Sequence, residues 1–401
     1  MQVQVLLPAP QKLHVSGFEP AHGAFAFCCC NFVLYLIYVK IKWVNDYNED
    51  LEISLQLING GKPRKNMEVN MSSKFPVRHS QLSPLALIDE LKKRYNLNNL
   101  VSCRFFREGI NDTYIVKTSI ENYFLRISPA GVYLRHDYEE ELFIINTLCE
   151  NGIRVASPVR CRDGSLIWEI DAPEGIRYAM LFTEAKRAPS KDETKMTYNL
   201  GRMVAQIHTI ADEKDFVVSR EPIQFEQLAI RPLKLIQPYL SHRLEDYDFL
   251  CGASEKLQGY VKSHFSFEKP YYGFCHGDIQ SGNVSFEGEM PTIFDFDCMG
   301  YGWRAYDICV FVWNHTLNDG KYIESDAWKA FLDGYNSVRQ LSDTEKASIN
   351  DFAALRTLWL MGLHADLIER LADCSWYNDG YFASRIRRFK LWYERSVSKE
   401  T

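Results

Sequence analysis

The chain has 401 residues, of which 46% are hydrophobic and 24% are charged, a composition typical of a folded globular protein. This length exceeds one ordinary domain, so two or three compact units are expected. A formal net charge of −6, without a long run of lysine and arginine, gives no electrostatic basis for binding nucleic acid.

Eleven cysteines are present, and none has the CxxC spacing typical of zinc and redox sites. Most of those after residue 100 have apolar neighbours, as reduced thiols in a protein core do. The cysteine pattern therefore predicts a cytoplasmic protein.

Residues 1–75 differ in pattern from the rest of the chain. An apolar run at residues 24–39 precedes Lys40 and Lys42. Its 16 residues fall short of the roughly 20 that span a bilayer, and a secretory signal carries its positive charge before the run. A membrane anchor, lipidated at cysteines 28–30, stays open as an alternative. The favoured interpretation is a poorly ordered or non-native extension, with Met67 and Met71 as alternative starts.

The next segment alternates helical and extended patterns. Ser83-Pro84 begins a helix predicted over residues 83–96. Short segments rich in β-branched and aromatic residues follow at 101–107, 113–118 and 123–127, and they predict an antiparallel sheet. A second helix is expected over 134–150, followed by strands at 159–161 with 166–170 and at 178–182. Residues 76–184 are thus expected to form an N-terminal lobe of antiparallel sheet plus helix.

The remaining chain, residues 185–401, has mainly helical patterns. Helices are predicted at residues 195–210, 225–239, 249–264, 303–314, 325–338, 344–371 and 381–397. Short extended pieces interrupt them within residues 271–310. The fold class indicated is α+β, with a larger, mainly helical C-terminal lobe.

Residues that can perform phosphoryl chemistry are concentrated within 271–310. His276 and Asp278 flank a glycine, Asn283 follows five residues later, and Asp295 and Asp297 end an apolar run. Phosphoryl transfer needs a metal on the phosphate oxygens, a carboxylate at the acceptor hydroxyl and a cation on the inner phosphates. Asp278 is the candidate to accept the proton of the acceptor hydroxyl. Asn283 and Asp295 offer hard oxygen ligands for magnesium. Asp297 either assists the metal or hydrogen-bonds the loop.

This order of HGD, asparagine and DFD resembles the aminoglycoside phosphotransferase and choline kinase branch of the bilobal protein-kinase-like fold. The stretch from Asp295 through the sequence GYG to Asp307 is most similar to bacterial RdoA-type kinases, which are related to type II homoserine kinases. The resemblance covers about residues 80–390. It implies use of ATP and Mg²⁺, Asp278 as the catalytic base, Asn283 and Asp295 as metal ligands, and His276 as a residue that shapes the catalytic loop.

The resemblance also assigns roles to the first lobe. The phosphate-contacting cation on strand 123–127 is Arg126 in place of the usual lysine, and Glu141 on the following helix is its ion-pair partner. Arginine is a departure from the family pattern, but its planar fork can bind phosphate oxygens at two points.

Two further segments are assigned to the nucleotide. The phosphate-covering loop, residues 107–113, has a single glycine, Gly109, with Asn111 and Thr113 as candidate phosphate contacts. A plain hairpin is the alternative for this loop. The adenine edge is expected to meet the main chain of residues 180–185, represented by Leu181, Phe182 and Thr183.

The function expected from these residues is transfer of the γ-phosphate of ATP to a hydroxyl of a small molecule, such as an amino alcohol, an aminoglycoside-like or a homoserine-like compound. The negative net charge weakly favours an amine-bearing acceptor. A protein Ser/Thr kinase and a degenerate kinase that acts as a binding module stay open, as does the oligomeric state. A two-metal hydrolase leaves Arg126 and Glu141 without a role, and a P-loop is excluded because Pro63 follows Gly61-Lys62.

Two other polar residues receive structural interpretations. Asp307, at the start of an apolar helix, is predicted to cap the helix or hold the catalytic loop. His208, inside the helix at 195–210, is predicted to be a hydrogen-bonded buried histidine.

Overall fold

The computed structural model describes residues 24–30, 33–41, 53–59, 62–69, 75–316, 321–371 and 373–398. The chain divides into two compact units, Met1–Pro76 and Val77–Thr401. Among the described residues, no helix is both long enough and apolar enough to cross a membrane.

The first unit contains an antiparallel sheet with strand order β1-β2-β3-β4. Its strands are β1 (Ala24–Cys30), β2 (Val33–Ile41), β3 (Ile53–Asn59) and β4 (Lys62–Val69). The predicted apolar run at 24–39 therefore falls on β1 and β2. The interpretation of residues 1–75 as a poorly ordered or non-native extension stays a prediction, and much of that segment, including Met71, lies outside the described residues.

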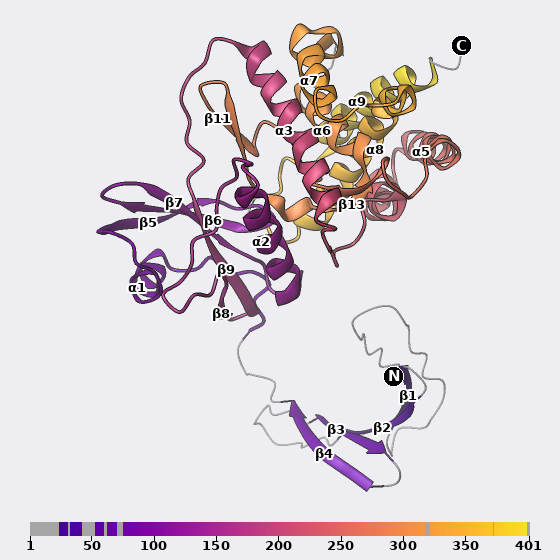
Figure 1. Ribbon diagram of the computed structural model, residues 1–401. Coiled ribbons are helices and arrows are strands. Elements are labelled where there is room, and N and C mark those ends of the chain that lie inside the picture. Colours follow the sequence, from indigo (N-terminus) through magenta and orange to yellow (C-terminus); the bar gives the residue numbers. More distant parts are fainter. Residues whose placement is uncertain are drawn as a thin grey trace. The chain divides into compact units, whose positions relative to one another are not determined.

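The second unit begins with a five-stranded antiparallel sheet of order β5-β6-β7-β9-β8 (Figure 1). Its strands are β5 (Leu100–Arg107), β6 (Asp112–Thr118), β7 (Asn122–Ile127), β8 (Trp168–Ala172) and β9 (Gly175–Thr183). The predicted antiparallel sheet is confirmed. Residues 159–161 differ from the prediction: they form no strand of the sheet, although the N–H of Val159 donates to Leu181 O at 2.8 Å.

Two helices cover opposite faces of this sheet, α1 (Pro84–Arg94) and α2 (Arg135–Glu150). Side chains alternate between the faces of a strand. Leu181 joins a core with Leu91 of α1, whereas Met180 and Phe182 join the core that contains Leu142 of α2. Arg126 lies opposite Met180 in the β7–β9 ladder, so it shares the α2 face of the sheet.

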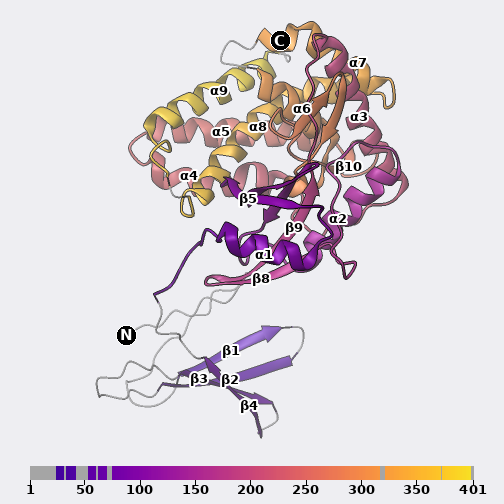
Figure 2. The ribbon, with the colours of Figure 1, turned by 90° about the vertical axis from the view of Figure 1, so that its left-hand side faces the viewer.

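The rest of the chain is mainly helical, as predicted, and the mixed helix-and-sheet architecture confirms the α+β class (Figures 1 and 2). The helices are α3 (Glu193–Glu213), α4 (Arg231–Ile236), α5 (Leu244–His264), α6 (Arg304–His315), α7 (Asp326–Asn336), α8 (Asp343–Leu367) and α9 (Asp379–Val397). The predicted helix at 225–239 is instead a π-helical turn, then α4, then a 3-10 turn. Pro232 and Pro238 lack the N–H that a continuous helix needs.

Helix α8 occupies the interior of the helical part, where it packs against α4, α5, α6 and α9. A capping box begins it: the N–H of Glu345 donates to Ser342 Oγ at 3.2 Å, and the Glu345 carboxylate accepts from the Ser342 N–H at 2.9 Å. Its side chains are buried on nearly every side, as expected for a helix that is apolar all round. The one strongly basic residue in its middle, Arg356, is 2% exposed.

Helices α3 and α7 approach each other closely because each contributes a glycine to the contact. A Cβ on Gly201 would collide with the main-chain oxygen of Phe331, and one on Gly334 would collide with that of Tyr198. The two helices therefore form a tightly packed pair.

Four short strands interrupt the helices between α5 and α6. β10 (Tyr272–Cys275) pairs with β13 (Gly300–Trp303), and β11 (Val284–Glu287) pairs with β12 (Met290–Ile293). Main-chain hydrogen bonds join Ile293 to Arg154 and Ala156, which connects this segment to the region that follows α2. The predicted lobe boundary near residue 185 lies between β9 and α3 and stays a prediction, because residues 77–401 cluster as one unit.

Candidate active site

The loop between β10 and β11 is fixed at its start by Asp307 of α6. The main-chain N–H groups of His276 and Gly277 each donate to the Asp307 carboxylate at 2.7 Å. His208 Nε2 donates to the same carboxylate at 3.0 Å, and His208 Nδ1 accepts from the Tyr335 hydroxyl at 2.9 Å. Asp307 thus holds the loop and His208 is a hydrogen-bonded buried histidine, as predicted for both residues.

The titration of this pair agrees with its hydrogen bonds. Burial lowers the pKa of His208 to about 4, which keeps the ring neutral. Burial opposes ionisation of Asp307, but the hydrogen bond from His208 holds the pKa of this carboxyl below its ordinary value. The support beneath the loop is therefore a neutral histidine on an ionised carboxylate.

His276 bridges the two ends of the motif. Its Nδ1 accepts from the N–H of Asp278 at 3.2 Å, and its Nε2 donates to Phe294 O at 3.3 Å. Burial lowers the pKa of His276, which agrees with the neutral ring that this pattern requires. These bonds support the predicted role of His276 in shaping the loop, because they tie Asp278 to the segment that leads to Asp295.

Asp278 itself has a partner on each carboxylate oxygen. Oδ2 accepts from Asn283 Nδ2 at 2.7 Å, and Oδ1 forms an ion pair with Arg356. Asn283 also donates to the main-chain oxygen of Asp278 at 3.0 Å. Because its amide nitrogen is committed to Asp278, the remaining amide oxygen of Asn283 is the atom left to bind a cation.

Asp295 is held next to Asn283 because the N–H of Phe294 donates to Asn283 O at 3.0 Å. Its backbone has φ = 68°, a left-handed conformation that is uncommon outside glycine and is found at functional sites. The side chain is 46% exposed. Protein atoms that displace water around it, together with the neighbouring charge of Asp297, raise the pKa of Asp295 to about 7.

This donor set fits magnesium. The Asn283 amide oxygen and the Asp295 carboxylate are hard oxygen ligands, which Mg²⁺ prefers. Burial and the charge of Asp297 disfavour the ionised form of Asp295. A bound divalent cation would stabilise that ionised carboxylate.

Arg126 lies at the centre of a buried charge network. Its guanidinium donates to Glu141 at 2.6 Å and lies 3.1 Å from Asp297 and 3.8 Å from Asp295. The ion pair with Glu141 is the one that the sequence predicts. The other carboxylate oxygen of Glu141 accepts from Arg220 at 2.6 Å, so that Glu141 joins two arginines.

Arg220 is a member of the network that sequence reasoning missed. It follows α3 in a polar segment and donates to the main-chain oxygens of Phe296 and Asp297 at 3.1 and 2.9 Å. No local pattern marks it, because its partners are distant in the chain. Arg356 was also missed, although an arginine within the apolar run of α8 is a signal that could have found it.

The predicted phosphate-covering loop lies over the same network. The Asn111 side chain contacts Asp297, so Asp297 binds Arg126 and the loop, in addition to any part it plays with the metal. Thr113 pairs with Arg126 in the β6–β7 ladder. Gly109 has no positive φ, and a Cβ at this position would meet only the main-chain oxygen of Asn111 at 3.8 Å, so the position does not itself require glycine.

In the segment predicted to contact adenine, most main-chain groups form hydrogen bonds within the protein. Leu181 O accepts from the N–H of Val159, and the N–H of Thr183 donates to Ser157 O at 2.9 Å. Phe182 pairs with Phe124 in the β7–β9 ladder, and its ring lies 5.0 Å from the Arg126 guanidinium. The structure therefore brings the Phe182 side chain to the candidate site, whereas the main chain of Leu181 and Thr183 has partners within the protein.

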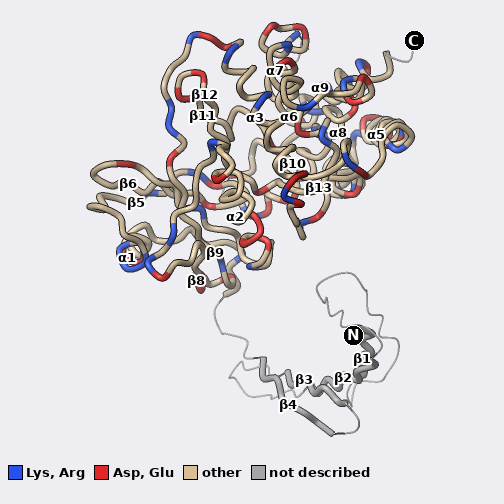
Figure 3. Tube along the Cα trace, viewed as in Figure 1, with Lys and Arg blue, Asp and Glu red and all other residues tan. Residues whose placement is uncertain are grey.

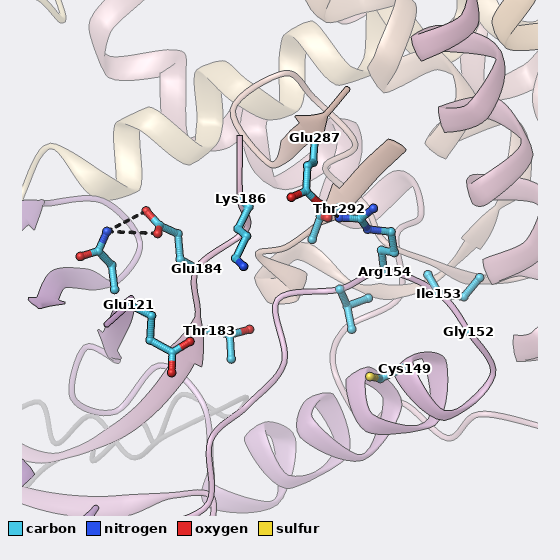
Figure 4. Close-up of a pocket in the computed structure, with 12 residues that line it drawn as sticks. Glu121, Cys149, Gly152, Ile153, Arg154, Thr183, Glu184, Lys186, Glu287 and Thr292 are labelled. Atoms are coloured by element: carbon cyan, nitrogen blue, oxygen red, sulfur yellow. Dashed lines mark hydrogen bonds and ion pairs between the residues drawn. The ribbon is translucent and has the colours of Figure 1, made fainter. Parts of the chain in front are cut away.

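A cavity of about 520 Å³ lies beside the end of β9 (Figure 4). Thr183, Glu184 and Lys186 line one side, and Arg154 with Glu287 lie across from them. Thr183 is the only predicted nucleotide-binding residue in this lining, which contains neither Asp278 nor Asp295. None of the predicted catalytic or metal-binding residues lines this cavity.

The sequence of this chain is similar to those of known proteins. Residues 102–341 match the phosphotransferase enzyme family. An uncharacterized protein of Synechocystis is 34% identical over 319 residues, which covers 79% of this chain and 87% of that protein. The homoserine kinase of Neisseria meningitidis is 26% identical over 255 residues and covers 63% of this chain and 79% of the kinase.

Solved structures share the fold at low sequence identity. A microcompartment-associated aminopropanol kinase matches with a TM-score of 0.66 and 21% identity, covering 79% of this chain and 98% of that chain. The amicoumacin kinase hAmiN, in complex with AMP-PNP, Ca²⁺ and Ami, matches with a TM-score of 0.62 and 20% identity, covering 78% of this chain and 93% of that chain. With more than half of its residues matched and the predicted motif assembled, the chain belongs to the phosphotransferase enzyme family.

Proposed function

We propose that this chain transfers the γ-phosphoryl group of ATP to a hydroxyl of a small molecule, with Mg²⁺ at Asn283 and Asp295. The observation that carries the proposal is the pairing of Asp278 with Asn283 next to Asp295, in the same unit as the buried Arg126–Glu141 ion pair. Positioning and charge stabilisation are what phosphoryl transfer asks of a protein.

In the proposed reaction the acceptor hydroxyl lies at the Asp278 carboxylate. The acceptor oxygen forms a bond to the γ-phosphorus, the bond between that phosphorus and the β–γ bridging oxygen breaks, and ADP leaves. The hydroxyl proton passes to Asp278, which Asn283 and Arg356 hold in place. Arg126 neutralises charge on the phosphate oxygens, and Mg²⁺ supplies further neutralisation when bound.

The nucleotide is expected to extend from the network around Arg126 toward the end of β9. Since the main chain of Leu181 and Thr183 is engaged within the protein, the adenine contact is expected just beyond them, at residues 184–185. Asn111 and Thr113 remain the candidate contacts from the phosphate-covering loop, near Gly109.

The acceptor is expected to be a small molecule, because relatives are named homoserine kinase, amicoumacin kinase and aminopropanol kinase. A protein Ser/Thr acceptor and a binding module without catalysis are the alternatives. The intact set of Asp278, Asn283 and Asp295 disfavours the binding module, since a degenerate kinase is expected to lose one of them. The eight cysteines from Cys103 to Cys374 are free thiols, and a cytoplasmic setting stays part of the proposal.

Replacement of Asp278 by Asn tests the proposal. The amide keeps the size of the side chain but accepts no proton, so transfer is expected to fall by about 100-fold or more while Mg-ADP binding stays within about threefold. ATP consumption is measured over amino alcohols, aminoglycosides and generic protein substrates, and ADP binding by titration calorimetry.

Asp326→Asn is the matched control, since this aspartate is 87% exposed on α7. A D278N protein that transfers phosphate at nearly the wild-type rate would show that Asp278 is not the base. Absence of both ATP binding and turnover in the wild type would favour the binding module.

A further inference from the structure

Three arginines on helices α8 and α9 lie near one another, and one of them, Arg356, reaches the Asp278 carboxylate. These helices pack against each other along the helical part (Figures 1 and 2). Arg356 of α8 stacks on Trp359, at 4.0 Å from its guanidinium carbon to the ring centroid, and reaches Asp278. Arg388 of α9 stacks on Trp313 at 4.0 Å, and the same ring lies 5.4 Å from Arg356. The third is Arg385, one turn before Arg388, which lies over the Tyr381 ring.

The positive charge of this cluster lacks a matching negative charge. Arg356 has Asp278, but no carboxylate among the described residues lies within ion-pair distance of Arg385 or Arg388. Arg388 donates to the main-chain oxygen of Trp313, while its Nε is buried without a hydrogen-bond partner. The cluster thus contains an unsatisfied buried donor on an arginine that has no acidic partner.

The electrostatic environment agrees with the contacts. Burial and the charges of Arg385 and Arg356 lower the pKa of Arg388 to about 10. Burial and the same two arginines lower the pKa of His364 to about 4, which keeps that ring neutral. Arg388 therefore adds a positive charge beside Trp313 that no described carboxylate pairs, whereas acidic and basic residues are interspersed along the described chain as a whole (Figure 3).

Arg388 is only partly buried, but its Nε is buried without a hydrogen-bond partner, so a ligand that supplies an acceptor would stabilise it. A buried charge without a partner destabilises a fold, and proteins generally pair such charges or place them where a ligand does so. The planar guanidinium of arginine offers two parallel donors that match a carboxylate or a phosphate. Aromatic rings on both arginines hold the side chains in place and restrict water, which strengthens binding of an anion.

We propose that the phosphate acceptor carries an oxyanion group, a carboxylate or a phosphate, which Arg388 binds with the help of Arg385. The hydroxyl of the same molecule then lies at Asp278, with Arg356 between the two ends. This inference rests on the proposed function and names the substrate class: a hydroxy acid or a phosphorylated alcohol. The net charge of the chain favoured an amine-bearing acceptor, whereas the arginine cluster favours an acceptor with an oxyanion, whether or not it also carries an amine.

Matched compounds provide the first test. Glycerate has a carboxylate in place of one CH2OH group of glycerol, glycerol 3-phosphate has a phosphate on one hydroxyl of glycerol, and homoserine adds a carboxylate to 3-aminopropan-1-ol. In protein saturated with Mg-ADP, at least one oxyanion compound is expected to bind about tenfold or more tightly than its neutral or cationic counterpart. The glycerate and glycerol 3-phosphate arms distinguish a carboxylate from a phosphate.

Substitutions on one helix provide the second test. Arg388→Gln is expected to abolish the difference within a pair, and Arg387→Gln is the control, because Arg387 is exposed on the same helix. With an acceptor that is turned over, Arg388→Gln raises the KM for that acceptor about tenfold or more and leaves the KM for ATP nearly unchanged. Circular dichroism of both variants verifies folding.

Equal affinity within every pair, or equal effects of the two substitutions, overturns the inference. Preferred turnover of the compounds that lack an oxyanion overturns it as well. Failure of Mg-ADP to bind counts against the proposed function instead. The matched pairs are then titrated without nucleotide, and the difference between Arg388→Gln and Arg387→Gln still decides whether an oxyanion binds here.

Discussion

Glu141 offers the sharpest test of the buried charge network, because one carboxylate joins two arginines. It is completely buried and accepts from Arg126 and from Arg220, each at 2.6 Å. Glu141→Gln keeps the size of the side chain but removes its charge. Breaking a buried ion pair from one side costs about 3–5 kcal/mol, since the remaining charge stays buried.

The other contacts of the arginines decide where in this range the loss falls. Arg126 keeps Asp297 at 3.1 Å, and Arg220 keeps the main-chain oxygens of Phe296 and Asp297. These contacts retain part of the stabilisation, so the expected decrease in the free energy of unfolding is about 3 kcal/mol. The KM for ATP is expected to rise, because Arg126 loses the partner that orients it.

Urea unfolding measures the decrease, and steady-state kinetics measure the KM. Glu139→Gln is the control: Glu139 lies on the same helix, is 55% exposed and pairs with Arg135 at 2.8 Å. An exposed pair one turn apart contributes about 0.5 kcal/mol or less. A decrease below about 1 kcal/mol for Glu141→Gln, or one equal to that of the control, would refute the role given to the buried charge.

Three further outcomes are expected. Asp295→Asn weakens Mg²⁺-dependent ADP binding about tenfold or more, equivalent to ~1.4 kcal/mol, while binding without Mg²⁺ changes little; calorimetry showing equal Mg²⁺ dependence in both proteins would argue against the metal site. The pKa of His208 is lowered by burial from 6.5 to about 4, so the unfolded chain binds a proton that the folded chain does not, and stability falls by up to about 3 kcal/mol as the pH drops from about 6.5 to about 4. Urea unfolding across this range should give a flatter profile for His208→Gln but not for the exposed His136→Gln, and identical profiles would contradict the assignment. Gly334→Ala places a methyl group against the main chain of α3 and lowers the free energy of unfolding by about 1–3 kcal/mol, whereas Gly259→Ala, which meets no atom within 4 Å, raises it by about 0.5–1 kcal/mol; the same sign for both substitutions in urea unfolding would contradict the close α3–α7 contact.

The geometry of the candidate catalytic segment was predictable from the sequence because its contacts are local. Asp278 and Asn283 lie five residues apart on one loop, and the apolar strand before Asp295 is visible as a pattern. The ion pair of Arg126 with Glu141 was predictable through family resemblance, which supplies the spatial neighbour that the spacing does not.

Residues whose partners are distant in the chain were not predictable in this way. Arg220 meets Glu141 across 79 positions, and Arg356 meets Asp278 across 78. The main-chain engagement of Thr183 by Ser157 likewise depends on the path of a segment that forms no strand. Periodicity identifies helices and strands, but it does not identify which side chains meet when those elements pack.

The double contact of Glu141 has a consequence for how the protein can be recombined with its relatives. Glu141 and Arg126 belong to the part of the chain before residue 185, and Arg220 belongs to the part after it. A chimera that takes its first half from a kinase without this glutamate would leave Arg220 buried beside the catalytic segment with only main-chain oxygens as partners. Exchange of the two halves is therefore expected to yield folded hybrids only when Glu141 and Arg220 are transferred as a pair.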